Sequence, residues 1–227
     1  MRIKFVEIQN FRKLRSCTVE FAEKTTVFVG ANNSGKTSAM DALSLFLLEK
    51  NQFTTTDLTL SNWIEINRIG DSWVNNNSED ASLDLSIKPW QEYLPSIDVW
   101  IEAANDEIHY VNHIIPTLDW GGGWLGIRLR FEPKNIEDLC KDYLSSFKSA
   151  KETTETAKGQ KGTDKVTLEL WPRTMREFLD KRLGTHFTVR AYTLDPTKCI
   201  LPKGGVAQPQ ELPGSTYLDR INTIYTS

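Results

Sequence analysis

The residues best suited to chemistry lie in one short stretch, Gly30 to Thr37, which reads GANNSGKT. Its spacing fits the pattern G-x-x-x-x-G-K-[ST], the phosphate-binding loop of nucleotide-binding proteins. The glycines of such a loop let successive backbone N–H groups point at one phosphate, and the N-terminus of the following helix adds a partial positive charge. Lys36 would reach the β- and γ-phosphates, and the hydroxyl of Thr37 would ligate Mg²⁺. The loop therefore predicts a site for a nucleoside triphosphate and its metal ion.

The segments on either side of the loop have the patterns that it requires. Residues 25–30, TTVFVG, are β-branched and aromatic, which predicts a strand buried on both faces. Residues 37–50 contain good helix formers with neither Gly nor Pro, which predicts a buried helix that ends near Lys50. Alternating residues predict two more strands before the loop, at 2–9 and 16–21.

Beyond residue 50 the patterns are shorter. Ser61 is the predicted cap of a short helix that runs through Glu65, with Gly70 beyond its end. Further helices are predicted over 90–94, 105–115, 135–151 and 172–184, and further strands over 96–103, 127–131, 166–171 and 186–194. The polar stretch 149–164 predicts an exposed linker, and the proline-rich last thirty residues predict mostly loop.

Composition limits the classes of protein that fit this chain. Its 227 residues are 39% hydrophobic and 25% charged with a net charge of −3, which favours a packed globular domain without the basic excess typical of nucleic-acid binders. The three cysteines, Cys17, Cys140 and Cys199, are far apart, which argues against a disulfide framework or a zinc cluster. With neither an apolar leader nor an apolar run of about 18 residues, we expect a cytoplasmic protein without a membrane partner.

Residues 8–43, IQNFRKLRSCTVEFAEKTTVFVGANNSGKTSAMDAL, resemble the N-terminal segment of ABC-type ATPases that act on DNA. These are the structural-maintenance-of-chromosomes (SMC) and RecF-like proteins and, above all, the OLD-family ATP-dependent nucleases. Asn10, Phe11 and Arg12 match an Asn-Phe-(Arg/Lys) element of that segment, and Asn32 matches the asparagine within its loop. The resemblance is strong over residues 1–48 and faint over 168–195.

The resemblance implies an α/β fold of the P-loop NTPase, ABC-ATPase type: an N-terminal lobe with a mixed sheet and an insertion of short helices and strands. It implies ATP and Mg²⁺ as ligands, and it places Arg12 against the phosphates; an ordinary surface arginine in a turn is the alternative for Arg12. Lys36 is the candidate catalytic residue and Thr37 the candidate metal ligand. The candidate nucleotide-binding residues are Arg12, Gly30, Asn32, Asn33, Ser34, Gly35, Lys36, Thr37 and Ser38.

Within one P-loop ATPase domain over 1–227, we expect three parts. Residues 1–50 would form the nucleotide-binding core, 51–164 a variable insertion that ends in the linker 149–164, and 165–227 a helix–strand element with a loop-rich end.

Hydrolysis in this family also needs a strand ending in Asp-Glu and a serine- and glycine-rich signature at a helix N-terminus. A predicted strand ends at Asp195, but Pro196 follows it in place of a glutamate, and the glycines of residues 201–208 lie among prolines that disfavour a helix. We therefore expect the catalytic half outside this chain, which would be an N-terminal fragment or the product of a split gene. A stand-alone, degenerate nucleotide-binding protein is the alternative.

Other polar residues give weaker patterns. His109 and His113 share the spacing of a metal pair but lack a third ligand, so we expect two partly exposed histidines. Arg128 and Arg130 alternate with apolar residues, which predicts a solvated strand face, with contact to DNA phosphates as the alternative. A glutamine that senses Mg²⁺ in some family members could correspond to Gln52 or to Gln91.

The sequence thus predicts the ATP-binding lobe of a DNA-directed ABC-type ATPase, part of an OLD-like ATP-dependent nuclease or of a defence or repair system. Hydrolysis would need a second lobe and a dimer partner. The expected partners are a second copy or another ATPase lobe, DNA, and a nuclease domain or subunit. The alternatives are an interaction module that nucleotide switches without hydrolysis, and a P-loop kinase.

Overall fold

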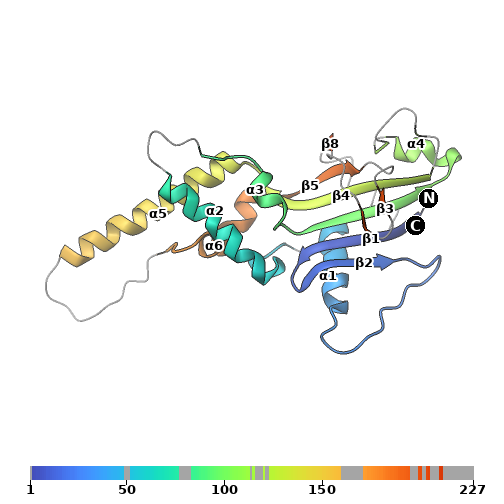
Figure 1. Cartoon of the computed structure of the whole chain (residues 1–227), viewed down its shortest axis with the longest axis horizontal. Coiled ribbons are helices and arrows are strands. Elements are labelled where there is room, and N and C mark those ends of the chain that lie inside the picture. The colour runs from blue at the N-terminus through green and yellow to red at the C-terminus, as the bar shows by residue number, and fades with distance from the viewer. Residues whose placement is uncertain are drawn as a thin grey trace.

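The structure, a computed structural model, describes residues 2–48, 52–76, 83–112, 114–115, 120, 123–159, 171–194, 199–200, 203–204 and 210–211. Within them the predicted α/β architecture is confirmed: a twisted sheet is packed against helices on one face and at one end (Figure 1). No described helix is both long enough and apolar enough to cross a membrane.

The sheet contains six strands in the order β2-β1-β3-β4-β5-β8, and every neighbouring pair is antiparallel. The strands are β1 (Arg2–Phe11), β2 (Leu14–Glu20), β3 (Ser96–Ala103), β4 (Gly123–Pro133), β5 (Phe187–Leu194) and β8 (Gln210–Glu211). Two further short strands, β6 (Cys199–Ile200) and β7 (Lys203–Gly204), pair with each other. Residues 51–164 therefore supply two central strands of the sheet that β1 and β2 begin.

The turn of the β1–β2 hairpin lies beside the phosphate-binding loop. Phe11 pairs with Leu14, so only Arg12 and Lys13 connect the two strands. Arg12 has a φ of 50°, in the left-handed region that a tight two-residue turn requires and that costs a non-glycine residue energy. The turn is held from outside, because the backbone N–H of Arg12 donates to the carbonyl of Asp57 at 2.8 Å.

Helices cover one face of the sheet and extend beyond one end of it. Helix α1 (Lys36–Leu47) lies against β1 and β2, whereas α2 (Trp63–Asn75), α5 (Ile136–Gly159) and α6 (Met175–His186) pack on one another at the end of the sheet (Figure 1). Helix α5 projects past both of its neighbours. Short elements connect these helices: η1 (Thr55–Asp57), η2 (Leu60–Asn62), α3 (Lys88–Gln91), η3 (Asn105–Glu107) and α4 (Ile108–Val111).

The helix-covered face of the sheet forms the main core. Alternate residues of β1, β3 and β4, among them Ile8, Val99 and Leu129, are fully buried there with Ala42 and Phe46 of α1. Burying side chains of this size stabilises the fold by about 1.5–3 kcal/mol each. The alternation predicted from the sequence is therefore the alternation that fixes the strand register.

The opposite face of the sheet carries buried ion pairs, so the prediction that Arg128 and Arg130 are solvated is wrong. Arg128 donates two hydrogen bonds of 2.6 Å to the carboxylate of Asp98, its cross-strand neighbour, and Arg130 donates to Glu132 at 2.5 Å. The two arginines are only 7% and 4% exposed. The alternation in the sequence was clear, but it could not show that a carboxylate thirty residues away along the chain would neutralise Arg128.

Two helices are longer than predicted. Helix α2 begins after Asn62 rather than at a Ser61 cap and continues through Gly70 to Asn75. Gly70 lies where α2 meets its neighbours: a Cβ there would fall 3.1 Å from the Cβ of Met175 and 3.2 Å from the Tyr143 ring. Helix α5 runs to Gly159, so residues 149–159 of the predicted linker are helical, because the sequence offers neither Gly nor Pro before that point.

Some predictions lie outside the described residues: most of the strand 166–171, part of the linker and most of the C-terminal end.

Candidate nucleotide-binding site

The phosphate-binding loop leads directly into α1. Gly35 has a φ of 93°, a left-handed conformation that glycine adopts at low cost, and Lys36 is the first helical residue. A side chain at Gly35 would also place its Cβ 2.9 Å from Leu14 of β2. The start of α1 has neither a side-chain cap nor an acidic residue in its first turn. Its backbone N–H groups and its partial positive charge are therefore available to an anion.

Lys36 folds back over the loop that precedes it. Its ammonium group donates to the carbonyl oxygens of Gly30 and Ala31, both at 2.7 Å, and to the hydroxyl of Ser34 at 3.3 Å. The loop is tight enough that a Cβ on Gly30 would lie 3.1 Å from that hydroxyl. The charge of Lys36 is thus held inside the curve of the loop, next to the N-terminus of α1.

The remaining loop residues face outward. Asn32, Asn33 and Thr37 are exposed and Ser38 is half-buried. Asn33 has a φ of 68°, which asparagine tolerates better than most residues. The exposed hydroxyl of Thr37, in the first turn of α1, has the position and the chemistry to ligate a hard cation such as Mg²⁺.

A cavity of about 450 Å³ adjoins the loop. Its walls come from β2, from residues 26–30, from the loop and from α1; they include Cys17, Phe28, Gly35 and Lys36. Burial raises the pKa of the Cys17 thiol above its ordinary value. The loop therefore borders a hollow, with the charge of Lys36 at its wall.

The strand predicted at 25–30 is not formed, which corrects the sequence interpretation. These residues belong to no strand, and Val27 and Val29 are 73% and 88% exposed. Only Phe28 packs partly against the core. A strand buried on both faces needs paired neighbours and covering layers, and no described strand pairs with this segment.

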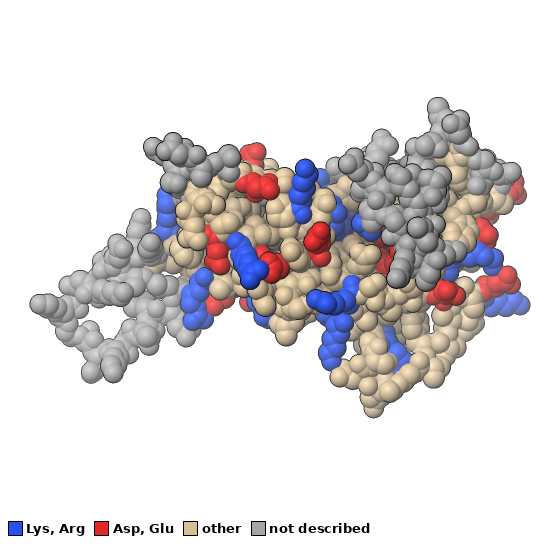
Figure 2. Space-filling model, viewed as in Figure 1, with Lys and Arg blue, Asp and Glu red and all other residues tan. Residues whose placement is uncertain are grey.

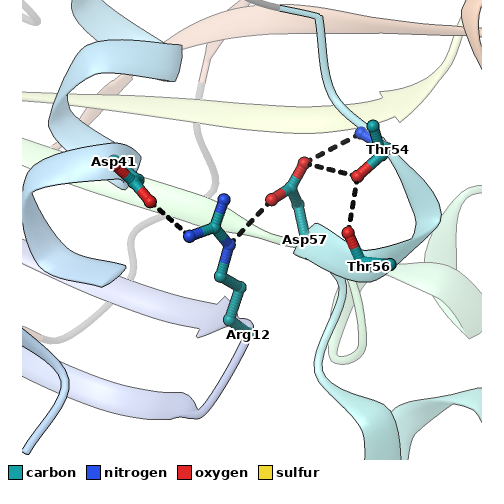
Figure 3. Close-up of polar contacts among 5 residues, drawn as sticks. All are labelled: Arg12, Asp41, Thr54, Thr56 and Asp57. Carbon is teal, nitrogen blue, oxygen red and sulfur yellow. Dashed lines mark hydrogen bonds and ion pairs between the residues drawn. The ribbon is translucent and has the colours of Figure 1, made fainter. Parts of the chain in front are cut away.

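Arg12 lies between two carboxylates (Figure 3). Its Nε donates to Asp57 at 2.9 Å, and its Nη1 forms a short ion pair with Asp41 of α1. Burial would lower the pKa of the guanidinium, but its hydrogen bonds to Asp57 and Asp41 raise that pKa above its ordinary value. Asp57 is itself held by the backbone N–H and the hydroxyl of Thr54. In this structure Arg12 thus joins the loop's helix to η1.

Lys13, the next residue, contacts the phosphate-binding loop itself. Its ammonium group donates to Oδ1 of Asn33 at 2.5 Å. Sequence reasoning missed this residue because the resemblance directed attention to Arg12. The missed signal was the second cation that directly follows Arg12 in the sequence.

An Asp-Glu pair does not border the cavity beside the loop, which has one carboxylate, Glu20 of β2, in its wall among the described residues. Asp195 lies outside them. The sequence does contain one Asp-Glu pair, Asp106–Glu107, just after β3. It lies near the end of β1 where Arg2 pairs with Glu102, whereas the loop contacts the opposite end of β1, so the two are separated by the length of a strand.

The other candidate residues stay apart from the loop contacts. His109 is exposed and lies against Tyr110, and His113 is outside the described residues. No group of His, Cys, Asp and Glu side chains in the described part of the chain could hold a metal ion. Gln52 and Gln91 are both exposed, and whether either senses Mg²⁺ stays a prediction.

Comparisons with known proteins identify the family of this chain. A family model described as an AAA ATPase domain matches residues 1–187. The DNA replication and repair protein RecF of Exiguobacterium sp. is 33% identical over 63 residues, which cover 28% of this chain and 17% of RecF. RecF of Listeria monocytogenes is 25% identical over 161 residues, which cover 65% of this chain and 40% of RecF. The chain thus spans 40% or less of these relatives.

A solved chain from work on ATP-driven dimerization and DNA-stimulated activation of SMC ATPases also overlaps with this one. The two chains are 14% identical, and the overlap covers 60% of this chain and 66% of the solved chain, with a TM-score of 0.33. An overlap at that score carries no argument. The family match does, because it extends over the phosphate-binding loop and four of the six strands of the sheet: this chain belongs to the AAA ATPase domain family.

Proposed function

We propose that this chain binds ATP with Mg²⁺ at residues Gly30 to Ser38 and serves as the nucleotide-binding lobe of a DNA-directed ATPase. The observation that carries the proposal is the position of Lys36: its ammonium group is held by two loop carbonyls at 2.7 Å, beside a helix start that has no side-chain cap. A phosphate placed there would gain the lysine charge, the backbone N–H groups and the helix dipole together.

The metal would be held largely by the nucleotide and by water. Thr37 supplies one hydroxyl ligand, and Mg²⁺ commonly takes only one or two protein ligands in addition to phosphate oxygens and waters. When bound, the ion would neutralise part of the phosphate charge. Thr37 itself would orient the ion relative to Lys36.

Hydrolysis would require groups from another lobe or subunit. Asp106–Glu107 lies at the far end of β1 from the loop, and the exposed run 25–30 has the composition of a strand that further strands would cover. We propose that a second lobe supplies the acidic strand beside residues 25–30 and that a second copy or partner ATPase closes on the γ-phosphate. Completion as an OLD-like nuclease, or as another repair or defence ATPase, is part of this proposal.

DNA contact would fall on the completed assembly. In Figure 2, Lys and Arg side chains alternate with Asp and Glu side chains on the visible face, without a continuous basic stripe among the described residues there. The support for DNA as a partner is the similarity to RecF, a DNA replication and repair protein.

A second candidate is a module that nucleotide switches without hydrolysis. It is favoured by the distance between the loop and Asp106–Glu107, since that acidic pair could not orient water for attack on a bound ATP. Both candidates require binding, and they differ in turnover once a second lobe is present.

The test is ATP binding and phosphate release by the 227-residue chain and by Lys36→Ala, with and without Mg²⁺. We expect binding that Lys36→Ala weakens at least about tenfold, the scale of one charge-assisted contact to phosphate. We expect no phosphate release from either protein. Equal affinity in the two proteins would contradict the proposed site, and turnover that Lys36→Ala abolishes would contradict the need for a second lobe.

A further inference from the structure

The β1–β2 turn presents two consecutive cations, and the structure gives them different partners. Arg12 turns toward Asp41 and Asp57 (Figure 3), whereas Lys13 reaches Asn33 in the phosphate-binding loop. A nucleotide in the loop would therefore meet Lys13 first. Each cation could bind phosphate only by breaking its present contacts, so the cost of breaking those contacts distinguishes the two.

Arg12 would have to abandon a nearly buried carboxylate. The side chain of Asp57 is 4% exposed, and among the described residues its partners besides Arg12 are the neutral N–H and hydroxyl of Thr54. Removing the cation would leave that charge without a counter-ion, which is costly away from water. Asp41 would lose its short ion pair at the same time.

The carboxylates also tie Arg12 to the rest of the fold. Asp41 belongs to α1 and Asp57 to η1, and Thr55 of η1 donates a short hydrogen bond to Asp180 of α6. The backbone N–H of Arg12 adds a third contact, to the carbonyl of Asp57. Arg12 thus connects α1 with the helices at the end of the sheet. It therefore acts as a positioning residue.

Lys13 has no ion pair to a carboxylate among the described residues. It is exposed, and its partner among the described residues is the neutral amide oxygen of Asn33 at 2.5 Å. A phosphate carries full negative charge and competes for an ammonium group far better than an amide oxygen does. Leu14, the residue after Lys13, packs against Gly35, which keeps the turn beside the loop.

We infer that Lys13 binds the phosphates of the bound nucleotide as the second cation of the site, and that Arg12 positions α1 instead of touching the nucleotide. This inference rests on the proposed function, because it assigns a further ligand of the same site. Lys36 would approach from inside the loop, and Lys13 from the β1–β2 turn.

The experiment compares the affinities of the chain for ATP and AMP in Lys13→Ala, with Lys24→Ala as the matched control. Lys24 is an exposed lysine next to Glu23, which pairs with Arg2 at the far end of β1. We expect Lys13→Ala to weaken ATP binding about tenfold, AMP binding much less, and the melting temperature not at all. Lys24→Ala should match the original chain in all three measurements.

The second arm tests Arg12 through Arg12→Met and, in case that variant folds poorly, through Asp41→Asn. Both should lower the melting temperature and leave the ratio of ATP to AMP affinity within about twofold, because a structural link acts on stability rather than on phosphate charge. A loss of that ratio in Arg12→Met, or tighter ATP binding in Asp41→Asn through a released arginine, would overturn the inference.

The Lys36→Ala variant keeps the two proposals separate. If Lys36→Ala loses ATP and Lys13→Ala binds it normally, the assignment of Lys13 fails while the proposed function stands. If Lys36→Ala binds ATP as well as the original chain does, the proposed function itself fails.

Discussion

Residues 25–30 and strand β3 are built from the same kinds of residue, yet only β3 is a strand. TTVFVG and SIDVWIEA both carry β-branched and aromatic side chains. Strand β3 is paired on both edges, with β1 and β4, and Val99 within it is fully buried. No described strand pairs with residues 25–30, and Val29 is 88% exposed.

The difference shows that β-propensity describes a fit to neighbours rather than a property of the segment. A strand gains its stability from cross-strand pairs and from burial of its faces. Strand β3 obtains both from β1 and β4, which flank it in the sheet. Residues 25–30 obtain no cross-strand pair in the described structure and bury only Phe28 in part, although they lead directly into the phosphate-binding loop.

The largest expected effect concerns the ion pair that joins β3 to β4. Arg128→Ala would leave Asp98 buried without its counter-ion and should lower the free energy of unfolding by about 3–5 kcal/mol. Replacing both partners together, Asp98→Leu with Arg128→Met, should cost less, because Asp98 is removed with its counter-ion and only Glu7, a buried carboxylate that also interacts with Arg128, loses a favourable contact. Urea unfolding of the original chain and of both variants checks this; a double variant as unstable as Arg128→Ala would contradict the explanation.

A smaller effect distinguishes the two segments directly by the same substitution. Val99→Ala in β3 should lower the free energy of unfolding by about 2 kcal/mol, since it removes buried methyl groups and leaves a cavity. Val29→Ala should change it by less than about 0.5 kcal/mol, because that side chain is already in water. Thermal and urea unfolding provide the measurement. Equal costs would show that residues 25–30 are packed in solution.

The smallest expected effect is that of the ligand. Mg²⁺ and ATP at about ten times the dissociation constant should stabilise the folded state by about 1.4 kcal/mol. Hydrogen exchange should slow most in the loop, the first turn of α1 and the β1–β2 turn, because these segments gain contacts with the nucleotide, and β3 should slow by no more than the global stabilisation. Lys36→Ala is the control without this protection. Slowing confined to β3 would contradict the site.

Much of this fold was predictable because its signals are local. The alternation in β1, β2, β3 and β5 and the loop's glycine spacing each depend on residues close together in the chain. Three predictions went wrong where the deciding contact was distant. Arg128 found Asp98 on the next strand, Gly70 met Met175 at a helix crossing, and residues 25–30 lacked the neighbours that a strand needs.

The sequence by itself determined the chemistry available at the loop: a lysine and a threonine after a glycine, at the start of a predicted helix, and two consecutive cations between the first two predicted strands. Only the tertiary structure decided where those cations point. Asp41 and Asp57 lie 29 and 45 residues from Arg12 along the chain, and Asn33 lies 20 residues from Lys13. Coulombic attraction and desolvation act through space. Which of the two cations is a structural link and which is a phosphate ligand therefore depends on the folded structure.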